Sequence, residues 1–242
     1  MAFIKLPSEG FHHAGCSAPL YITIVLYLYR NSQGDKDTRY GTVSIQEIKD
    51  LFGYGRNSKQ TERIRSTLKN LLNSDFLSLD SRFIKQNVKC DIGTAAPLKT
   101  LYYKFDKTVF NNLPDGTWTK FEEKTIDTLL NSERNFNMPN NRLYNLVNIY
   151  FFVHRRIYNE CYKVTINSLK KDLRLTGDTI YDCLQVIECM ELLYHKQFYN
   201  PLTKQKETYF RRDPFTDSFV PDEIKEAHGK FQRSLQRGGF GF

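Results

Sequence analysis

The sequence predicts an α+β protein that is mostly helical and contains one arrangement of elements twice. An almost wholly apolar stretch over 20–30 precedes a pair of helices over 42–76, and the second of these helices is basic. The spacing of apolar residues then changes from the helical period to the alternation of strands. The same order of patterns returns over 141–211, and a repeat of whole units is a strong indication of architecture.

The helix pair over 42–76 is predicted by a capping box and by two apolar stripes. Ser44 suits a helix N-cap, and Glu47 three residues later completes the box. Gly53 and Gly55 then interrupt the helical spacing, because glycine adopts positive φ angles at little cost. The apolar stripe of the second helix comprises Ile64, Leu68, Leu71 and Leu72. Its outer face carries Arg56, Lys59, Arg63, Arg65 and Lys69 against one acid, Glu62.

The elements around this pair follow a definite order. A proline opens the apolar helix over 20–30, at a position where proline is tolerated. A short strand at 42–43 leads into the capped helix. After the basic helix, a strand over 76–80, a polar connection over 81–97 and a return strand over 98–105 form a hairpin. A helix, a strand, two helices and a hairpin make up a winged helix, in which the hairpin loop is the wing.

The second copy matches the first position by position. An apolar helix over 141–158 leads to a strand and a capped helix over 163–173, in which Thr165 takes the place of Ser44. After a shorter turn, a second helix and a hairpin over 194–211 complete the copy. The matched apolar positions include Val43 with Val164, Ile45 with Ile166, Ile48 with Leu169, Ile64 with Ile180 and Leu68 with Leu184. We therefore predict two winged-helix domains in tandem.

The chain divides into four predicted segments. Residues 1–111 form the first winged-helix domain, preceded by an arm that its apolar side chains pin to the core. Residues 112–138 are a turn-rich linker with one short helix, and 139–212 form the second winged-helix domain. Residues 213–242 are predicted as a tail without a clear core. The residues of this tail best suited to dock are Phe215, Phe219 and Ile224.

The composition favours a polyanionic partner and a reducing compartment. The 242 residues include 35 Lys and Arg against 27 Asp and Glu, and the net charge of +8 attracts nucleic acid. The five cysteines form no C-x-x-C pair, and their odd number is typical of free thiols. The chain starts without the apolar region of a signal peptide, and its apolar runs fall short of the about 20 residues that span a bilayer. We therefore expect a cytoplasmic protein.

The sequence carries no catalytic motif. It contains no phosphate-loop pattern, no dinucleotide-binding glycine pattern and no H-E-x-x-H zinc motif. His12 and His13 are adjacent but have no second group of metal ligands nearby in the sequence. Asp178 and Asp182 are one helical turn apart, as on an exposed helix face. We therefore expect no enzyme activity, no catalytic residue, no metal and no cofactor.

Double-stranded DNA is the partner that the basic helix predicts. A helix-turn-helix protein places such a second helix in the major groove, with its first residues at the bases. The residues expected to contact DNA in the first domain are Arg56, Asn57, Ser58, Lys59, Gln60 and Arg63, with Lys85 and Lys89 from the wing. The second domain's equivalent helix is acidic, so its expected contacts come from the flanks: Lys170, Lys171, Arg174, Lys204 and Lys206. Either this domain binds DNA through its wing and flanks, or it is a dimerisation module.

Two winged helices in one chain of this length, each with a long apolar first helix, resemble the replication initiators of theta-replicating plasmids. The opening Phe3-Ile4-Lys5-Leu6-Pro7, followed by an apolar helix, is similar to the start of initiators from plasmids of Gram-positive bacteria. The resemblance covers about residues 3–212 in architecture. It implies binding to repeated origin sites (iterons), origin melting in DNA replication initiation, recruitment of host replication proteins, and a homodimeric form.

Other functions are compatible with the same features, because a fold does not specify a function. A transcriptional repressor, a partition protein or a phage primosome component would also use winged helices on DNA. A winged-helix protein-interaction or dimerisation module would suit the acidic second copy. A nuclease without a known motif is the third class of function.

Overall fold

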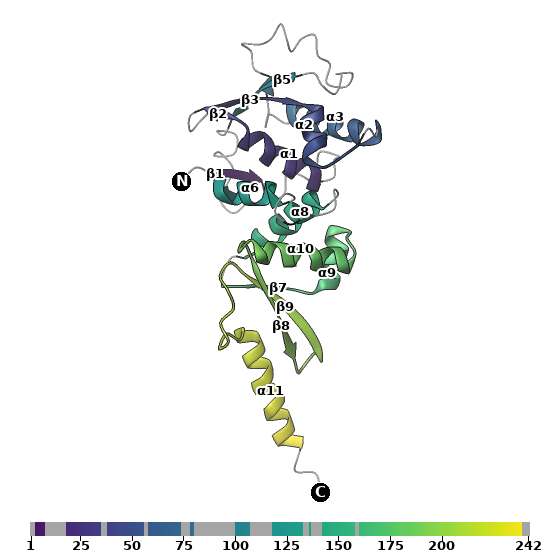
Figure 1. Ribbon diagram of the computed structural model, residues 1–242. Helices are drawn as coiled ribbons and strands as arrows, with labels where there is room; N and C mark the ends of the chain where they lie inside the picture. The colour runs from purple at the N-terminus through teal and green to yellow at the C-terminus, as the bar shows by residue number, and fades with distance from the viewer. Residues whose placement is uncertain are drawn as a thin grey trace. The chain divides into compact units, whose positions relative to one another are not determined.

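The computed structural model describes residues 3–7, 18–34, 38–55, 58–73, 78–79, 100–106, 118–132, 136, 142–157 and 160–238. Over these residues the protein is α+β and mostly helical, with eight helices and nine short strands in antiparallel sheets (Figure 1). The chain forms two compact units, Met1–Asn148 and Ile149–Phe242.

Helix α1, Ala18–Arg30, is the central helix of the first unit. From Leu20 to Tyr29 only Tyr27 is not fully buried, as expected of a helix that is apolar on all sides. Pro19 lies in the first turn, where its missing N–H breaks no helical hydrogen bond. The predicted apolar helix is therefore confirmed.

A four-stranded antiparallel sheet accompanies α1. Its strands are β2 (Gln33–Gly34), β3 (Thr38–Ser44), β4 (Ser78–Leu79) and β5 (Thr100–Asp106), in the order β2-β3-β5-β4. Strands β3 and β5 pair over their whole length and so place Gly41 opposite Tyr103. The Tyr103 hydroxyl donates a hydrogen bond of 2.7 Å to the Leu28 carbonyl, which ties the sheet to α1. Burial raises the pKa of Tyr103 above its usual value, so this hydroxyl stays protonated.

Helices α2, Ile45–Leu51, and α3, Ser58–Asn73, are the predicted pair. The capping box is confirmed: the Glu47 N–H donates to Ser44 Oγ at 3.1 Å, and the Ser44 N–H donates to the Glu47 carboxylate. Gly53 in the following turn has a φ of 58°, the left-handed region that favours glycine. The hairpin strands are observed at β4 and β5, and the predicted wing over 81–97 lies outside the described residues.

The segment predicted as a linker, 112–138, differs in the structure. Part of it forms β6 (Trp118–Glu122), which pairs antiparallel with β1 (Phe3–Pro7), and then α6 (Glu123–Leu130), which contacts α1. On β1 the side chains of Ile4 and Leu6 are buried, as predicted for the N-terminal arm. Because the two strands lie far apart in the sequence, local patterns did not reveal their pairing.

Two ion pairs also join α6 to the rest of the first unit. Arg39 of β3 lies 2.6 Å from the Glu123 carboxylate and stacks on the Tyr29 ring, 4.5 Å from its centroid. Arg30, at the end of α1, lies 2.5 Å from Asp127. Helix α6 therefore belongs to the first unit. The boundary between the two units follows Asn148, inside α8 (Leu143–His154).

The second unit contains the predicted second copy from its strand onward, and the boundary between the units falls inside the apolar helix of that copy, α8. Strand β7 (Tyr162–Val164) leads into α9 (Ile166–Leu173), where Thr165 is the N-cap and accepts from the Ser168 N–H at 3.1 Å. Helix α10 (Gly177–Cys189) and the hairpin of β8 (Tyr194–Asn200) and β9 (Gln205–Arg211) follow in the predicted order. Strand β9 lies between β7 and β8, as β5 lies between β3 and β4 in the first unit. The repeat of element order is therefore present, together with the same strand pairing.

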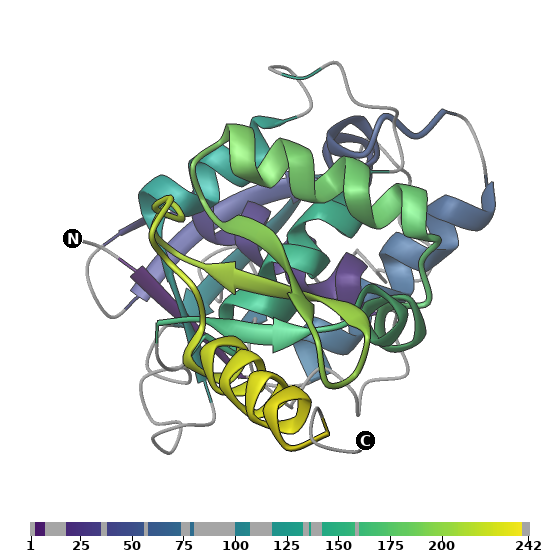
Figure 2. The same cartoon turned by 90° about the horizontal axis from the view of Figure 1, so that it is seen from below.

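The C-terminal segment was predicted to lack a clear core, but most of it is a packed helix, and the predicted docking of Phe215, Phe219 and Ile224 is confirmed. Residues 222–238 form helix α11, Asp222–Gly238, in which Ile224 and Ala227 are buried (Figure 1). Phe215 and Phe219 pack on Phe198 of β8, with ring centroids 6.0 and 6.4 Å away. Helices α10 and α11 thus lie on opposite sides of the sheet of the second unit (Figure 2). The apolar positions of α11 are too few to be recognised without the sheet that they cover.

A polar cluster joins α11 to this sheet. Lys163 Nζ lies 2.9 Å from Glu207 Oε2 and 3.5 Å from Glu223 Oε2, and the Tyr209 hydroxyl lies 3.2 and 3.1 Å from the same two oxygens. Asn200 also donates to Glu207 at 3.1 Å. Burial by itself would raise the pKa of Glu207. The hydrogen bond and charge of Lys163, together with Asn200 and Tyr209, outweigh burial and hold that pKa below its usual value.

We predict that Gly41→Ala destabilises the first unit. A β-carbon on Gly41 would overlap the hydroxyl and ring of Tyr103, whose hydrogen bond to the Leu28 carbonyl resists displacement. Overpacking of this kind costs about 1–3 kcal/mol in free energy of unfolding. The change in the free energy of unfolding is measured by chemical denaturation, followed by the fluorescence of the single tryptophan, Trp118. The matched control is Gly55→Ala, where a β-carbon meets nothing within 4 Å; equal destabilisation by both variants would contradict this packing.

We also predict a pH-dependent contribution of Glu207. Because its pKa is lower in the folded than in the unfolded protein, ionised Glu207 stabilises the fold above the ordinary carboxyl pKa of about 4.3. This contribution is lost as the pH falls through the folded-state pKa. The difference in free energy of unfolding between wild type and Glu207→Gln should therefore be largest near neutrality and shrink in acid. Asp217→Asn, at an exposed carboxylate of the same unit, is the control and should change the free energy of unfolding little.

Candidate nucleic-acid interface

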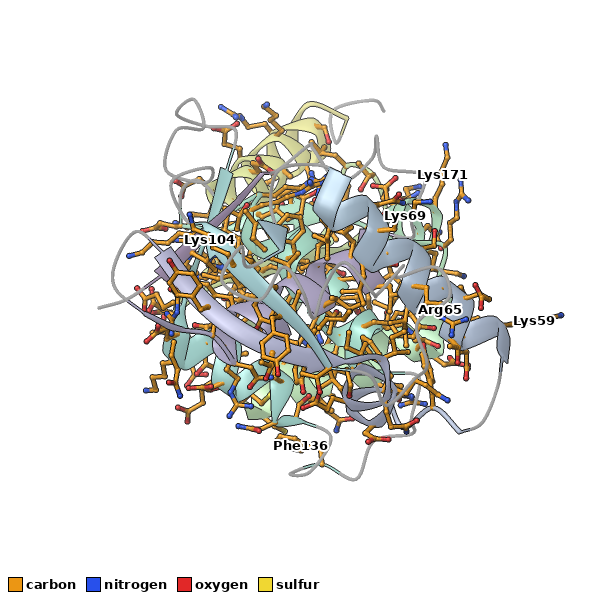
Figure 3. The ribbon with its side chains drawn as sticks, turned by 90° about the horizontal axis from the view of Figure 1, so that it is seen from above. Lys59, Arg65, Lys69, Lys104, Phe136 and Lys171 are labelled. Atoms are coloured by element: carbon orange, nitrogen blue, oxygen red, sulfur yellow. The ribbon has the colours of Figure 1, made fainter. Side chains whose placement is uncertain are left out.

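The outer face of α3 carries cations that were predicted to contact DNA. Its apolar stripe of Ile64, Leu68 and Leu71 is buried, with exposed fractions of 1% or less. The stripe fixes the rotation of the helix, so the opposite face reaches solvent. The exposed residues among those described in α3 lie on one side of the helix and are Lys59, Glu62, Arg63, Ser66 and Lys69. Figure 3 shows Lys59 extending outward from the first turn of α3.

Arg65 differs from the other cations of α3. Its side chain is 16% exposed and forms an ion pair with Glu62, one turn earlier, which is 63% exposed. The pair neutralises one positive charge next to the exposed face. Since α3 contains four Lys and Arg and one carboxylate, its net charge is still +3. A helix with this excess of positive charge on its outer side is suited to a phosphate backbone.

The described residues include only part of the predicted set in the first unit. Lys59 and Arg63 are exposed, and Gln60 is half-buried in the first turn of α3. Ser58 is the first residue of the helix. Arg56, Asn57, Lys85 and Lys89 lie outside the described residues, so their roles stay predictions. Lys69 was not among the predicted contacts, although its helical spacing from Glu62 and Ser66 places it on the same face.

The predicted cations of the second unit form two groups. Lys170 and Lys171 are exposed in the last turn of α9, and exposed Arg174 follows as its C-cap with a left-handed φ of 55°. The other group lies at the end of the hairpin. Lys204 is exposed in the turn, also with a φ of 55°, and Lys206 is exposed on β9. The turn between α9 and α10 thus gathers three cations, and the hairpin end gathers two.

Helix α10 lacks the cations that α3 exposes. With Ile180 matched to Ile64, the positions of Lys59, Arg63, Arg65 and Lys69 correspond to Leu175, Thr179, Tyr181 and Gln185. Asp178 is exposed in its first turn, and the Glu188 carboxylate lies 3.1 Å from His195 Nδ1 of β8. The buried stripe is retained, with Ile180, Leu184 and Ile187 each 2% exposed or less. The two units therefore share a core pattern but present different outer faces.

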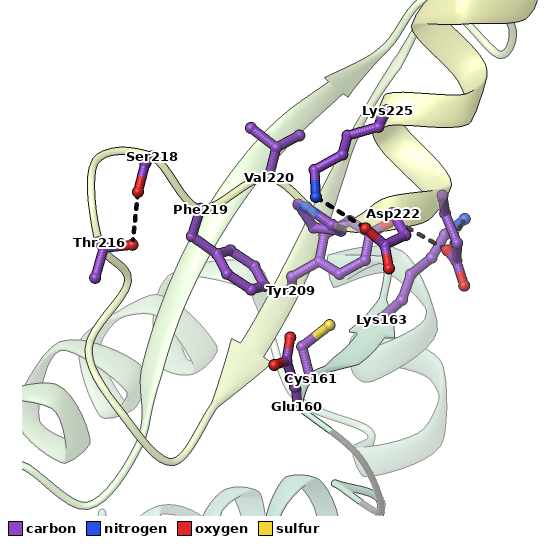
Figure 4. A pocket seen from close by; sticks show the side chains of 12 residues that line it. Glu160, Cys161, Lys163, Tyr209, Thr216, Ser218, Phe219, Val220, Asp222 and Lys225 are labelled. Carbon is purple, nitrogen blue, oxygen red and sulfur yellow. Dashed lines mark hydrogen bonds and ion pairs between the residues drawn. The ribbon is translucent and has the colours of Figure 1, made fainter.

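A cavity of about 580 Å³ lies in the second unit, between β7, β9 and the segment that leads into α11 (Figure 4). Four of the charged side chains that line it form ion pairs: Lys163 with Glu223 at 3.5 Å, and Lys225 with Asp222 at 2.9 Å. Burial raises the pKa of the Cys161 thiol at its wall, which disfavours the nucleophilic thiolate. Nowhere in the described ranges do three or more His, Cys, Asp or Glu side chains gather to hold a metal ion.

No helix among the residues with described structure is long and apolar enough to cross a membrane. The exposed cations of α3 and of the α9–α10 turn are the features most suited to an anionic partner. Comparison of the chain with protein-family models, with curated proteins and with solved structures found no match.

Proposed function

We propose that the protein binds double-stranded DNA in a sequence-specific manner, with α3 of the first unit as its recognition helix. The observation that carries this proposal is the outer face of α3, where Lys59, Arg63 and Lys69 are exposed opposite a buried apolar stripe. A helix of 16 residues in the major groove can reach base edges with Arg63 and phosphates with the lysines. The net charge of +8 adds a general attraction for DNA.

The architecture proposed for this function is a tandem winged helix. In each copy an apolar helix, a strand, a capped helix, a second helix and two further strands follow in order, and the first copy has the additional short strand β2 after its apolar helix. The strand order β3-β5-β4 recurs as β7-β9-β8, which supports a common fold for both copies. In this arrangement α2 and α9 support α3 and α10, and the hairpins act as wings.

The two copies contribute unequally to DNA binding in this proposal. Helix α3 reads the bases, whereas α10 exposes Asp178, whose carboxylate a phosphate would repel. The cations Lys170, Lys171 and Arg174 at the α9–α10 turn add contacts to the phosphate backbone. Such contacts position a protein on the duplex without reading its sequence.

The biological role that we propose is replication initiation of a plasmid or another mobile element, through binding to repeated sites at its origin. The repeated order of elements and the repeated strand pairing within one chain support this role, and the protein would act in the cytoplasm with its DNA. A transcriptional repressor or a partition protein is the alternative. Directly repeated target sites beside the gene would favour an initiator, and a palindrome over its own promoter would favour a repressor.

We predict that Arg63→Ala weakens binding to a duplex selected from a random-sequence library with the wild-type protein. Loss of a contact to a base edge raises Kd by roughly 5- to 150-fold, which corresponds to about 1–3 kcal/mol. Fluorescence anisotropy with the labelled duplex measures Kd. The matched control is Lys124→Ala, at an exposed cation of α6 in the same unit, which should leave Kd unchanged.

The salt dependence separates base contacts from phosphate contacts. Lys59→Ala should make the slope of log Kd against log salt shallower by about one, while the preferred sequence stays the same. Arg63→Ala should instead relax the sequence preference. If the library yields no enriched duplex, or if Arg63→Ala and Lys124→Ala bind equally well, the proposal fails.

A further inference from the structure

Helix α11 changes from acidic to basic along its length. Its carboxylates all lie in its first five residues and are Asp222, Glu223 and Glu226. From residue 227 to the end of the printed sequence there are three further cations, Lys230, Arg233 and Arg237, and no Asp or Glu. The side chains of Lys230 and Arg233 are exposed. The second half of α11 therefore carries an excess of positive charge.

The interactions of these two cations are local to the helix and leave them able to bind an anion. Lys230 Nζ lies 3.7 Å from the Glu226 carboxylate, and these side chains are 61% and 72% exposed. An ion pair between groups as exposed as these is weak. Arg233 donates from Nε to the Gly229 carbonyl at 3.2 Å, and its guanidinium has further N–H donors.

The turn of the β8–β9 hairpin adds cations beside this part of α11. Figure 1 and Figure 2 both show α11 running along the hairpin and past its turn. Asn200 Oδ1 accepts from the Leu202 N–H at 3.0 Å and so holds the turn. Lys204 in the turn and Lys206 on β9 are exposed, and residues 200–206 contain no Asp or Glu. We give the name basic end to the set of Lys204, Lys206, Lys230 and Arg233.

The exposed side of the second half of α11 is polar, which distinguishes it from a membrane-binding helix. The apolar side chains that the structure describes in α11 are withdrawn from solvent: Ile224 and Ala227 are buried, and Phe231 is half-buried. The exposed residues described over 227–234 are His228, Lys230, Gln232, Arg233 and Ser234. A helix that lies on a membrane needs an exposed apolar face as well as cations. A phosphate backbone needs only the cations, because duplex DNA carries one negative charge per about 1.7 Å of its axis.

We infer that the basic end binds the phosphate backbone of duplex DNA, so that α11 and the hairpin turn form one contact site. This inference rests on the proposed DNA binding, and it adds an element that lies outside both helix pairs. Contacts to phosphate position a protein on the duplex without reading its sequence. The basic end therefore raises affinity and lengthens the DNA segment that is covered, while the choice of sequence stays with α3.

Neutralisation of the basic end in the full-length chain tests the inference. The double variant Lys230→Gln/Arg233→Gln removes two phosphate contacts. The slope of log Kd against log salt should therefore become shallower by about two, and Kd should rise about tenfold near physiological salt. The preferred sequence should stay the same. The matched control is Lys225→Gln near the start of the same helix, where the lysine pairs with Asp222; it should leave Kd and the slope unchanged.

A series of shortened duplexes locates the contact. The duplex selected with the wild-type protein is shortened stepwise from each end, while its preferred sequence is kept. The wild type should lose about tenfold in affinity at the step that removes the backbone beneath the basic end. The Lys230→Gln/Arg233→Gln variant should lose little at that step, because its contact is already absent.

Three outcomes would overturn the inference. The double variant would bind the full duplex as tightly as the wild type, Lys225→Gln would weaken binding equally, or the double variant would lose binding to phosphatidylglycerol vesicles but not to DNA. Thermal unfolding by circular dichroism should show that all variants fold. If no duplex is enriched, the proposed function fails. If a duplex is enriched and weakened by Arg63→Ala but bound normally by the double variant, only the role of the basic end fails.

Discussion

The burial of one stripe of α3 is the constraint on which the chemistry of the first unit depends. Ile64, Leu68 and Leu71 are almost completely inaccessible to solvent. A half-turn of the helix about its axis would expose all three side chains to water. This exposure would cost about 1.5–3 kcal/mol of folding free energy for each side chain. The helix therefore keeps a single rotation, which leaves Lys59 and Arg63 exposed on its outer side. The proposed DNA contacts follow from this packing.

The two copies show how far an outer face can change while a core is retained. Ile64 and Ile180 occupy the same place in their helices, and both are fully buried. One position further on, the first copy has Arg65 in an ion pair with Glu62, and the second has the exposed ring of Tyr181. A buried position must be filled with apolar volume, whereas an exposed one tolerates many side chains. The two matched positions therefore differ in charge and in aromatic exposure.

The second unit has a sheet that is covered on both sides. Helix α10 covers one side, and α11 with the segment before it covers the other. The carboxylate of Glu207 is buried on the side of the sheet that α11 covers. Burial of an unpaired charge would cost folding free energy. Lys163, Asn200 and Tyr209 offset this cost, and Lys163 also reaches Glu223 at the start of α11. The same cluster therefore neutralises a buried charge and holds the last helix on the sheet.

The sequence by itself determined the local elements: the apolar helices, the capping box of Ser44 and Glu47, the hairpin of β8 and β9, and the repeat. These depend on residues a few positions apart, so spacing and capping chemistry are sufficient to predict them. It also indicated that Lys59 and Arg63 are exposed, because the stripe of α3 is visible in the sequence. Only the tertiary structure decided the pairing of β1 with β6, the docking of α11 and the hydrogen bond of Gln197 in β8 to Tyr181 in α10. Each of these brings together segments whose own patterns are too short or too polar to identify a partner, and the partner becomes apparent only when the chain has folded.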